Sequence, residues 1–220
     1  ISTGAVVPPD ATVVVAQEDA RREGDDIFVA DPAVLRPGRF IRTAGSDWDA
    51  GSLRLPRGSE LGPAELAMLI ALERSAVPVF KRPSVAIIST GDELLAPAEP
   101  YREGAVRSSN GPMLAHQAIT AGGEVTTNVV VPDESAPLVT ALHAASEANL
   151  ILTSGGVSVG DHDHIHAGLQ ECGAAVLFRR VRMRPGRPVT IACMGDSLIC
   201  ALPGNPASSW ATFELLARPA

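Results

Sequence analysis

At residues 85–93 the sequence reads Val-Ala-Ile-Ile-Ser-Thr-Gly-Asp-Glu, an apolar run that ends in a polar loop with a glycine. A second apolar run, Leu-Ile-Leu-Thr at 150–153, is followed in the same way by Ser-Gly-Gly. Continuous apolar strands of this kind are typical of a parallel sheet that helices cover on both faces. The two stretches therefore predict an α/β fold with a doubly wound, mostly parallel sheet.

The elements around these two runs alternate in the same manner. Strands are predicted at 85–89, 124–131 and 150–153, and helices at 111–121, 135–147 and 162–171. Three strands joined by short turns follow at 176–183, 189–193 and 198–201, before a last helix at 205–216. Because short turns join antiparallel neighbours, we expect an antiparallel edge on the parallel sheet.

The sequence before residue 81 has a different texture. Short β-type runs at 12–16, 27–30 and 40–42 are broken by Gly, Pro and Asp and show no helical period. A helix is predicted from Gly62 to about Val77, with Pro63 and Glu65 in its first turn. An irregular β-rich region and a linking helix are thus expected before the α/β domain, with the boundary at the connector 81–84.

The composition of the chain argues against nucleic acids and membranes as partners. The chain has 18 basic and 25 acidic residues in 220, a formal charge of −7, which argues against a general nucleic-acid binder. No apolar run approaches the roughly 18 residues of a membrane span, and no signal peptide is evident at Ile1. We therefore expect a cytoplasmic protein with neither nucleic-acid nor membrane partners.

Three polar loops follow predicted strands, at 89–93, 153–160 and 202–208. Ligands of open α/β sheets bind at the carboxyl ends of the strands, where glycine amides and hydroxyls can hold phosphate. Any one of these loops taken alone is better read as a tight turn, but together they favour a site. The substrate-binding residues predicted here are Ser89, Thr90, Gly91, Ser154, Gly155, Gly156, Ser158, Pro203, Gly204, Asn205 and Pro206.

Carboxylates fall at the same predicted edge. Glu93 belongs to the first loop, Asp133 follows the second strand, and Asp163 comes shortly after the third. Such groups can hold a magnesium ion that bridges phosphate and oxyanion groups, although helix capping is the simpler alternative. Zinc is disfavoured, because His162 and His166 lack the accompanying glutamate and third ligand of a zinc motif.

Five arginines lie within nine residues, at 179, 180, 182, 184 and 187. In a strand over 178–184, Arg180, Arg182 and Arg184 would share one face, where their charges repel unless an anion lies among them. We predict an anion site here, with an exposed strand face as the alternative.

Four motifs together point to a family. They are Ser-Thr-Gly-Asp-Glu-Leu at 89–94, Ser-Gly-Gly-Val-Ser-Val-Gly at 154–160, Arg-Pro-Gly-Arg-Pro at 184–188 and Leu-Pro-Gly-Asn-Pro at 202–206. In this order and spacing the chain resembles the molybdopterin molybdotransferases, that is, the MoeA proteins and the E domain of gephyrin. The resemblance implies a magnesium-dependent homodimer that inserts molybdate into adenylylated molybdopterin, forming molybdenum cofactor and releasing AMP.

The resemblance also implies a domain plan. Residues 1–44 would be part of the family's β-rich second domain, 45–80 part of its elongated first domain, and 81–220 a MoaB/MogA-like molybdopterin-binding domain. The family's regions before Thr3 and after Ala220 would lie outside this sequence. A MogA/MoaB-like molybdopterin adenylyltransferase, which is also an expected partner, and a gephyrin-like scaffold without turnover are the alternatives.

Site roles are implied by motif. The expected catalytic residues are Thr3, Asp47, Glu93, Asp133 and Asp163, the last three of which would hold Mg²⁺. The expected ligands of molybdate or phosphate are Arg180, Arg184 and Arg187, at positions where the family commonly has lysine.

Overall fold

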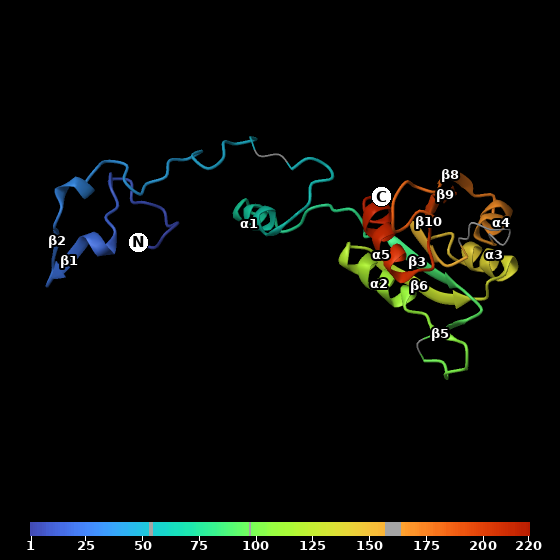
Figure 1. Ribbon diagram of the computed structural model, residues 1–220. Helices are drawn as coiled ribbons and strands as arrows, with labels where there is room; N and C mark the ends of the chain where they lie inside the picture. The colour runs from blue at the N-terminus through green and yellow to red at the C-terminus, as the bar shows by residue number, and fades with distance from the viewer. Residues whose placement is uncertain (53–54, 97, 157–163) are drawn as a thin grey trace. The chain divides into compact units, whose positions relative to one another are not determined.

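The structure, a computed structural model, describes residues 1–52, 55–96, 98–156 and 164–220. Contacts divide the chain into two compact units, Ile1–Val77 and Pro78–Ala220, both drawn in Figure 1. The finer division at residue 44 stays a prediction.

The first unit contains little regular structure. Strands β1 (Ala20–Glu23) and β2 (Asp26–Val29) pair as an antiparallel hairpin, flanked by short 3₁₀ turns at Gln17–Asp19 and Pro32–Val34. The expected strand at 27–30 is therefore confirmed in outline. The β-type runs at 12–16 and 40–42 form no assigned strand. The Val14 amide donates to Arg39 O at 3.1 Å and the Gly38 amide to Thr12 O at 2.7 Å, as in an irregular β region, and the strand at 20–23 was not predicted.

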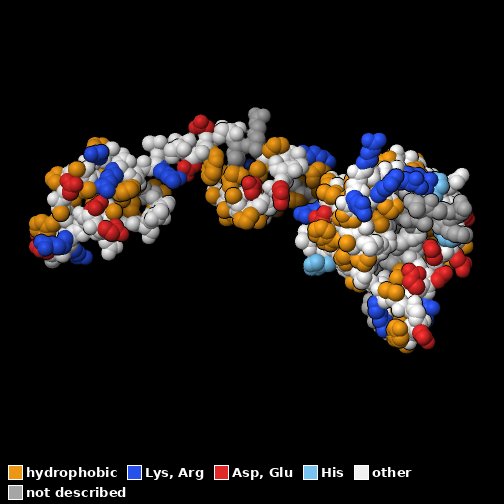
Figure 2. Space-filling model, in the orientation of Figure 1, with side chains coloured by type: hydrophobic (Ala, Val, Ile, Leu, Met, Phe, Trp, Pro, Cys, Tyr) orange, Lys and Arg blue, Asp and Glu red, His pale blue; other side chains and the backbone are white. Residues whose placement is uncertain are grey.

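Helix α1 (Pro63–Ala71) is shorter than predicted. The Gly62 amide donates to Glu65 Oε2 at 3.0 Å, which satisfies one of the free donors at the helix start. The helix ends early because Glu73 takes a left-handed φ of 59° and the Arg74 amide folds back onto Leu69 O at 2.8 Å. Figure 2 shows hydrophobic side chains gathered over α1, where Ile70 is 68% exposed.

The second unit is built on one six-stranded sheet. Its strand order is β6-β3-β7-β10-β9-β8. The bounds are Glu124–Val131 for β6, Ser84–Thr90 for β3, Leu150–Ser154 for β7, Ser197–Leu202 for β10, Thr190–Met194 for β9 and Ala175–Arg179 for β8. Strands β6, β3, β7 and β10 are mutually parallel, and β9 is antiparallel to both of its neighbours. The mostly parallel sheet and its antiparallel edge are thus confirmed.

Helices cover both faces of this sheet (Figure 1). They are α2 (Asn110–Thr120) and α5 (Pro206–Thr212, continued by the π-helical turn η3, Phe213–Ala217) on one face, and α3 (Ser135–Ala144) and α4 (His164–Glu171) on the other. Ile87 of β3 joins a core cluster with Leu114 of α2, whereas Ile88 joins another with Leu138 of α3. Neighbouring residues of one strand thus feed two cores, as a doubly wound fold requires. No helix in the described part is long and apolar enough to cross a membrane.

Two short segments complete the unit. Strands β4 (Leu94–Leu95) and β5 (Val106–Arg107) form a small parallel pair that the sequence did not predict. Helix α3 stops three residues short of its expected end, because residues 145–147 form turns. The first residues of the helix expected at 162–171 lie outside the described residues.

The strand predicted at 176–183 is wrong in its second half. Strand β8 ends at Arg179, because Arg180 takes a left-handed φ of 61° and the chain turns there. The Arg180 amide donates to Val189 O at 2.7 Å, and the Val181 amide donates to Arg187 O at 3.1 Å. Arg182 and Arg184 therefore lie in a loop, and the shared strand face expected for the arginines does not form.

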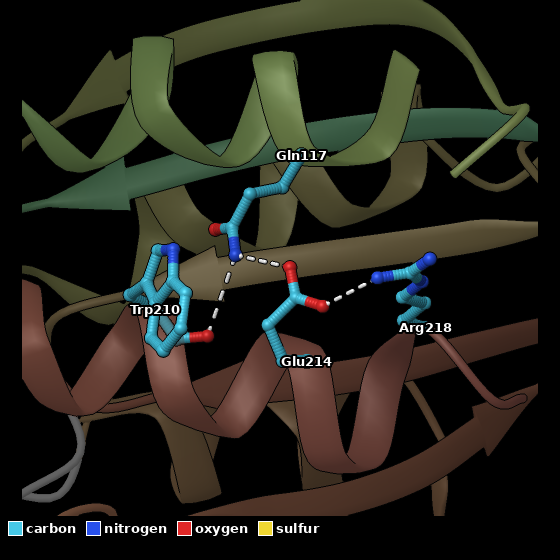
Figure 3. A network of polar contacts seen from close by, with 4 residues as sticks. All are labelled: Gln117, Trp210, Glu214 and Arg218. Atoms are coloured by element: carbon cyan, nitrogen blue, oxygen red, sulfur yellow. Dashed lines mark hydrogen bonds and ion pairs between the residues drawn. The ribbon is translucent and has the colours of Figure 1, made fainter. Parts of the chain in front are cut away.

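A polar network joins α2 to the last helix (Figure 3). Gln117 Nε2 donates to Glu214 Oε1 at 2.8 Å and, more weakly, to Trp210 O at 3.4 Å. Arg218 donates to the second Glu214 oxygen at 2.8 Å. These contacts join the two helices on one face of the sheet.

Candidate functional site

The strand order places a switch point at β3. The chain runs from β3 to β6 on one side and then returns past β3 to β7 on the other. Ligands of open α/β sheets bind outside the carboxyl ends of the strands at such a point. Ser89 of β3 is paired in register with Ser154 of β7, so the loops that follow these two strands start side by side.

A cavity of about 420 Å³ lies at this edge of the sheet. It is lined by Thr90, Gly91, Glu93, Leu94, Asn110, Asp133, Ser154, Gly155, Gly156 and Gly204. The structure thus brings together residues from all three predicted loops and from the carboxylates. Only Leu94 and Asn110 were not among the predicted site residues.

Glycine is needed where these loops meet. Gly155 has φ +101°, and a Cβ built on it would lie 2.3 Å from Thr90 O, which is closer than two such atoms can approach. Gly204 approaches from the third loop, its own Cβ position 3.3 Å from Gly155 Cα. At this edge of the sheet the loops therefore pack backbone against backbone, and glycine is required because protein atoms fill the space that a side chain would need.

Two carboxylates, Glu93 and Asp133, line the cavity. The Asp133 amide donates to Asp92 Oδ1 at 3.0 Å, which ties the loop after β6 to the loop after β3. Arg102 in turn donates to the backbone carbonyl of Asp92. Asp133 Oδ1 is buried and has no hydrogen-bond donor among the described residues. A buried carboxylate oxygen without a donor is suited to a cation.

The predicted metal set is described only in part. Asp163 lies outside the described residues, as does Ser158. Within the ranges that the structure describes, no group of three or more His, Cys, Asp or Glu side chains is placed to hold a metal. Glu93 and Asp133 remain the carboxylates that this cavity offers.

Two buried hydroxyl groups line the cavity as well. Thr90 is 5% exposed and Ser154 is 2% exposed. Thr90 Oγ1 has no partner among the described residues, whereas Ser154 Oγ accepts a hydrogen bond from Asn110. Ser89 is also buried, but it does not line the cavity.

The predicted arginines are not among the residues that line the cavity. Arg180, Arg184 and Arg187 are exposed, and their side chains make no hydrogen bond or ion pair within the described chain. Figure 2 shows Lys and Arg side chains gathered on the second unit near β8 and β9. The structure therefore presents these arginines as an open basic surface, and their role as anion ligands stays a prediction.

The prolines of the third loop shape it without lining the cavity. Pro203 is buried at the end of β10, and Pro206 is the first residue of α5. Asn205 caps that helix, its Oδ1 accepting from the Ser208 amide at 3.2 Å. These contacts fix the path of the chain past Gly204.

Thr3 and Asp47 belong to the first unit. Thr3 is exposed, and Asp47 forms an ion pair with Arg42 at 2.6 Å. Their predicted catalytic roles stay untested by the geometry of either unit.

Asn110 was missed because its role is not local. The sequence places an Asn at the start of a predicted helix, which reads as an ordinary cap. Its side chain instead donates to Ser154 Oγ at 2.7 Å and to Gly204 O at 2.8 Å. Partners 44 and 94 residues away cannot be read from spacing along the chain.

Comparison with known proteins agrees with this geometry. Residues 86–220 match the family described as "Probable molybdopterin binding domain", and residues 1–72 match the "MoeA N-terminal region (domain I and II)". Proteins named molybdopterin molybdenumtransferase are 38% identical in Nostoc sp. and 36% identical in Bacillus subtilis, each covering 100% of this chain. This chain covers only 51% and 52% of those relatives, or about half of their length.

A solved structure shares the architecture. The crystal structure of a molybdopterin biosynthesis MoeA protein from Pyrococcus horikosii aligns with a TM-score of 0.75 at 30% identity, covering 99% of this chain and 54% of that one. The matched segments include every residue that lines the cavity. The chain therefore belongs to the molybdopterin-binding family of the MoeA proteins.

Proposed function

We propose that this chain is part of a molybdopterin molybdenumtransferase. The enzyme takes adenylylated molybdopterin and molybdate as substrates, forms molybdenum cofactor, and releases AMP. The observation that carries the proposal is the cavity at the carboxyl ends of β3 and β7, where glycine backbone, two hydroxyls and two carboxylates converge. The relatives are about twice as long as this chain, and their names support the same activity.

The donors of the cavity fit a phosphorylated substrate. Thr90 and Ser154 offer hydroxyl groups, and the backbone of Gly155 and Gly156 lines the same cavity. Phosphate oxygens accept hydrogen bonds from hydroxyls and amides of this kind. In the proposed reaction these groups hold the adenylyl phosphate and orient its bond to the pterin phosphate for cleavage.

Glu93 and Asp133 fit a magnesium ion. Mg²⁺ prefers oxygen ligands and is usually held by one or two carboxylates together with substrate phosphates. Asp133 Oδ1, which is buried and has no donor among the described residues, matches that need, and Asp163 would complete the predicted set. Bound there, the ion would neutralise phosphate charge. The protein's part is to hold Asp133 in place, which the Asp92 side chain does through the Asp133 amide.

Further parts of the proposal rest on the resemblance and the relatives. The enzyme would act as a cytoplasmic homodimer, with Thr3 and Asp47 contributing to catalysis and a molybdopterin adenylyltransferase supplying its substrate. The match of residues 1–72 to a MoeA N-terminal region favours the transferase over an adenylyltransferase, which the second unit alone would resemble.

Glu93→Gln tests the proposal. The substitution keeps the shape of the side chain and removes the charge, so we expect molybdate insertion and AMP release by the full-length enzyme to fall by at least about a hundredfold. Turnover of adenylylated molybdopterin by molybdate is the measurement, with circular dichroism to confirm the fold.

Glu103→Gln is the matched control, because Glu103 is exposed and does not line the cavity. It should leave turnover unchanged. Full activity of the Glu93 variant would contradict the assignment of the site. A wild-type protein that consumed ATP would be an adenylyltransferase, and one that released no AMP would fit a scaffold.

A further inference from the structure

Asn110, the first residue of α2, ties two of the cavity loops together. Its Nδ2 donates one hydrogen bond to Ser154 Oγ at 2.7 Å and another to the backbone carbonyl of Gly204 at 2.8 Å. The amide thereby joins the end of β7 to the loop after β10. Both of its protons are used inside the protein, and its Oδ1 is buried without a partner among the described residues.

These two bonds fix the direction of the Ser154 hydroxyl. A backbone carbonyl only accepts hydrogen bonds, so the nitrogen of the Asn110 amide, and not its oxygen, must face Gly204. The same nitrogen lies against Ser154 Oγ, which therefore accepts in this contact. Ser154 is 2% exposed and donates to no other described residue. Its proton is left for a group in the cavity that Ser154 lines.

A second unused hydroxyl lies on the neighbouring strand. Thr90 lines the same cavity, and its Oγ1 is buried without a partner in the described chain. It lies 2.9 Å from the position of a Cβ on Gly155, the residue that follows Ser154. Two hydroxyl protons beside a glycine turn are suited to a group with several acceptor oxygens, such as a phosphate.

We infer that Asn110 is a positioning residue that makes Ser154 a hydrogen-bond donor to a phosphate oxygen of the ligand. The inference rests on the proposed function, which brings the adenylyl phosphate to this cavity. It assigns recognition of that phosphate to Ser154 together with Thr90. Asn110 acts through Ser154 and does not itself touch the ligand.

Asn110→Asp tests the inference in the full chain, with AMP as the probe in titration calorimetry. The carboxylate has nearly the same shape but no proton for Ser154, so Ser154 donates to it and no longer to the ligand. The added negative charge also repels phosphate. We expect AMP to bind about ten- to a hundredfold more weakly. Wild-type affinity in this variant would overturn the inference.

Asn149→Asp is the matched control. It makes the same change of amide to carboxylate at the amino ends of the strands, where Asn149 Oδ1 accepts from the Ser84 amide at 3.0 Å. A carboxylate keeps that acceptor, so the affinity for AMP should stay at the wild-type value. An equal loss in both variants would mean that added charge alone weakens binding, against the inference.

A double-mutant cycle separates positioning from direct contact. Asn110→Ala and Ser154→Ala are measured singly and together against AMP. If Asn110 acts through Ser154, the double variant binds AMP about as weakly as Ser154→Ala alone. Independent, additive losses would overturn the inference.

Hydrogen exchange on the free chain keeps the inference separate from the proposed function. A wild-type chain that binds no AMP would contradict the proposed function. Asn110→Asp should still speed amide exchange in residues 155–156 and 204–205, and leave the interiors of β3 and β7 protected. Unchanged exchange in these loops overturns the role of Asn110, whether or not AMP binds.

Discussion

Gly155 lies where the loop after β7 touches the loop after β3. Gly155→Ala places a methyl group 2.3 Å from Thr90 O at a φ of +101°, so both strain and overlap oppose the change. We expect the free energy of unfolding to fall by more than about 2 kcal/mol. AMP binding should be lost as well, because the loops must part. Urea unfolding and calorimetry measure the two effects.

Gly173→Ala isolates the strain. Gly173 has a φ of +67°, but a Cβ there meets no atom of the described chain within 4 Å. We expect a loss of about 1 kcal/mol in stability and no change in AMP affinity. If Gly155→Ala and Gly173→Ala lose the same stability, the backbone near Thr90 must shift at little cost to make room for the methyl group.

For single residues, the sequence predicts which residue types form the site, but it does not predict which side chains bond to one another. Thr90, Glu93, Asp133 and the loop glycines were predicted for the site, because polar loops after apolar strands meet at one sheet edge. Asn110 was not, since its partners come from distant loops. Side-chain contacts between residues that are distant in the sequence produce no periodic pattern from which they could be predicted.

Among the elements, α2 and the last helix are coupled through Glu214 (Figure 3). Two hydrogen bonds hold the pKa of Glu214 below its ordinary value of 4.5. The bond from Arg218 has the larger effect and the bond from Gln117 the smaller one. A carboxylate whose pKa is lowered by folding stabilises the folded state above its unfolded pKa. That contribution is lost as the pH falls through the folded value.

Glu214→Gln should therefore lower stability in a pH-dependent way. The difference in free energy of unfolding between wild type and variant should be fully present well above pH 4.5, and should shrink as the pH falls below it. Urea unfolding at a series of pH values measures it. Glu124→Gln is the control, because the exposed Glu124 side chain makes no hydrogen bond within the described chain. A difference independent of pH would mean that packing, and not charge, joins these helices.

The centre of the sheet was predictable because β3 and β7 are continuous apolar runs buried on both faces, which is typical of a parallel sheet covered by helices. The error at 176–183 has a local cause. Alternation of apolar and basic residues continues past Arg179, but the positive φ at Arg180 ends the strand, and arginine gives no sign of that conformation. In the first unit, the β-type run at 12–16 exchanges backbone hydrogen bonds with residues 38 and 39, but neither it nor the run at 40–42 forms an assigned strand, because propensity alone does not extend such contacts into a ladder.

For the whole molecule, the division at Val77 and Pro78 has a thermodynamic consequence. Both core clusters lie within the second unit, from Val85 to Ala217, and so do all the residues that line the cavity. A domain that contains its whole core can fold alone. We therefore expect a fragment of residues 78–220 to unfold cooperatively, at nearly the midpoint of the same unit in the full chain, and to bind AMP.

Cys200 reports this unfolding from inside the core. It is fully buried in β10, and burial raises the pKa of its thiol to about 12. Because the thiolate is the reactive form, alkylation at pH 8 should proceed only when the unit unfolds globally. The labelling rate of Cys200 should then be the same in the fragment and in the full chain across a urea series. Faster labelling in the fragment would show that residues 1–77 stabilise this core. In that case the two units, although separate in their contacts, would unfold as one cooperative unit.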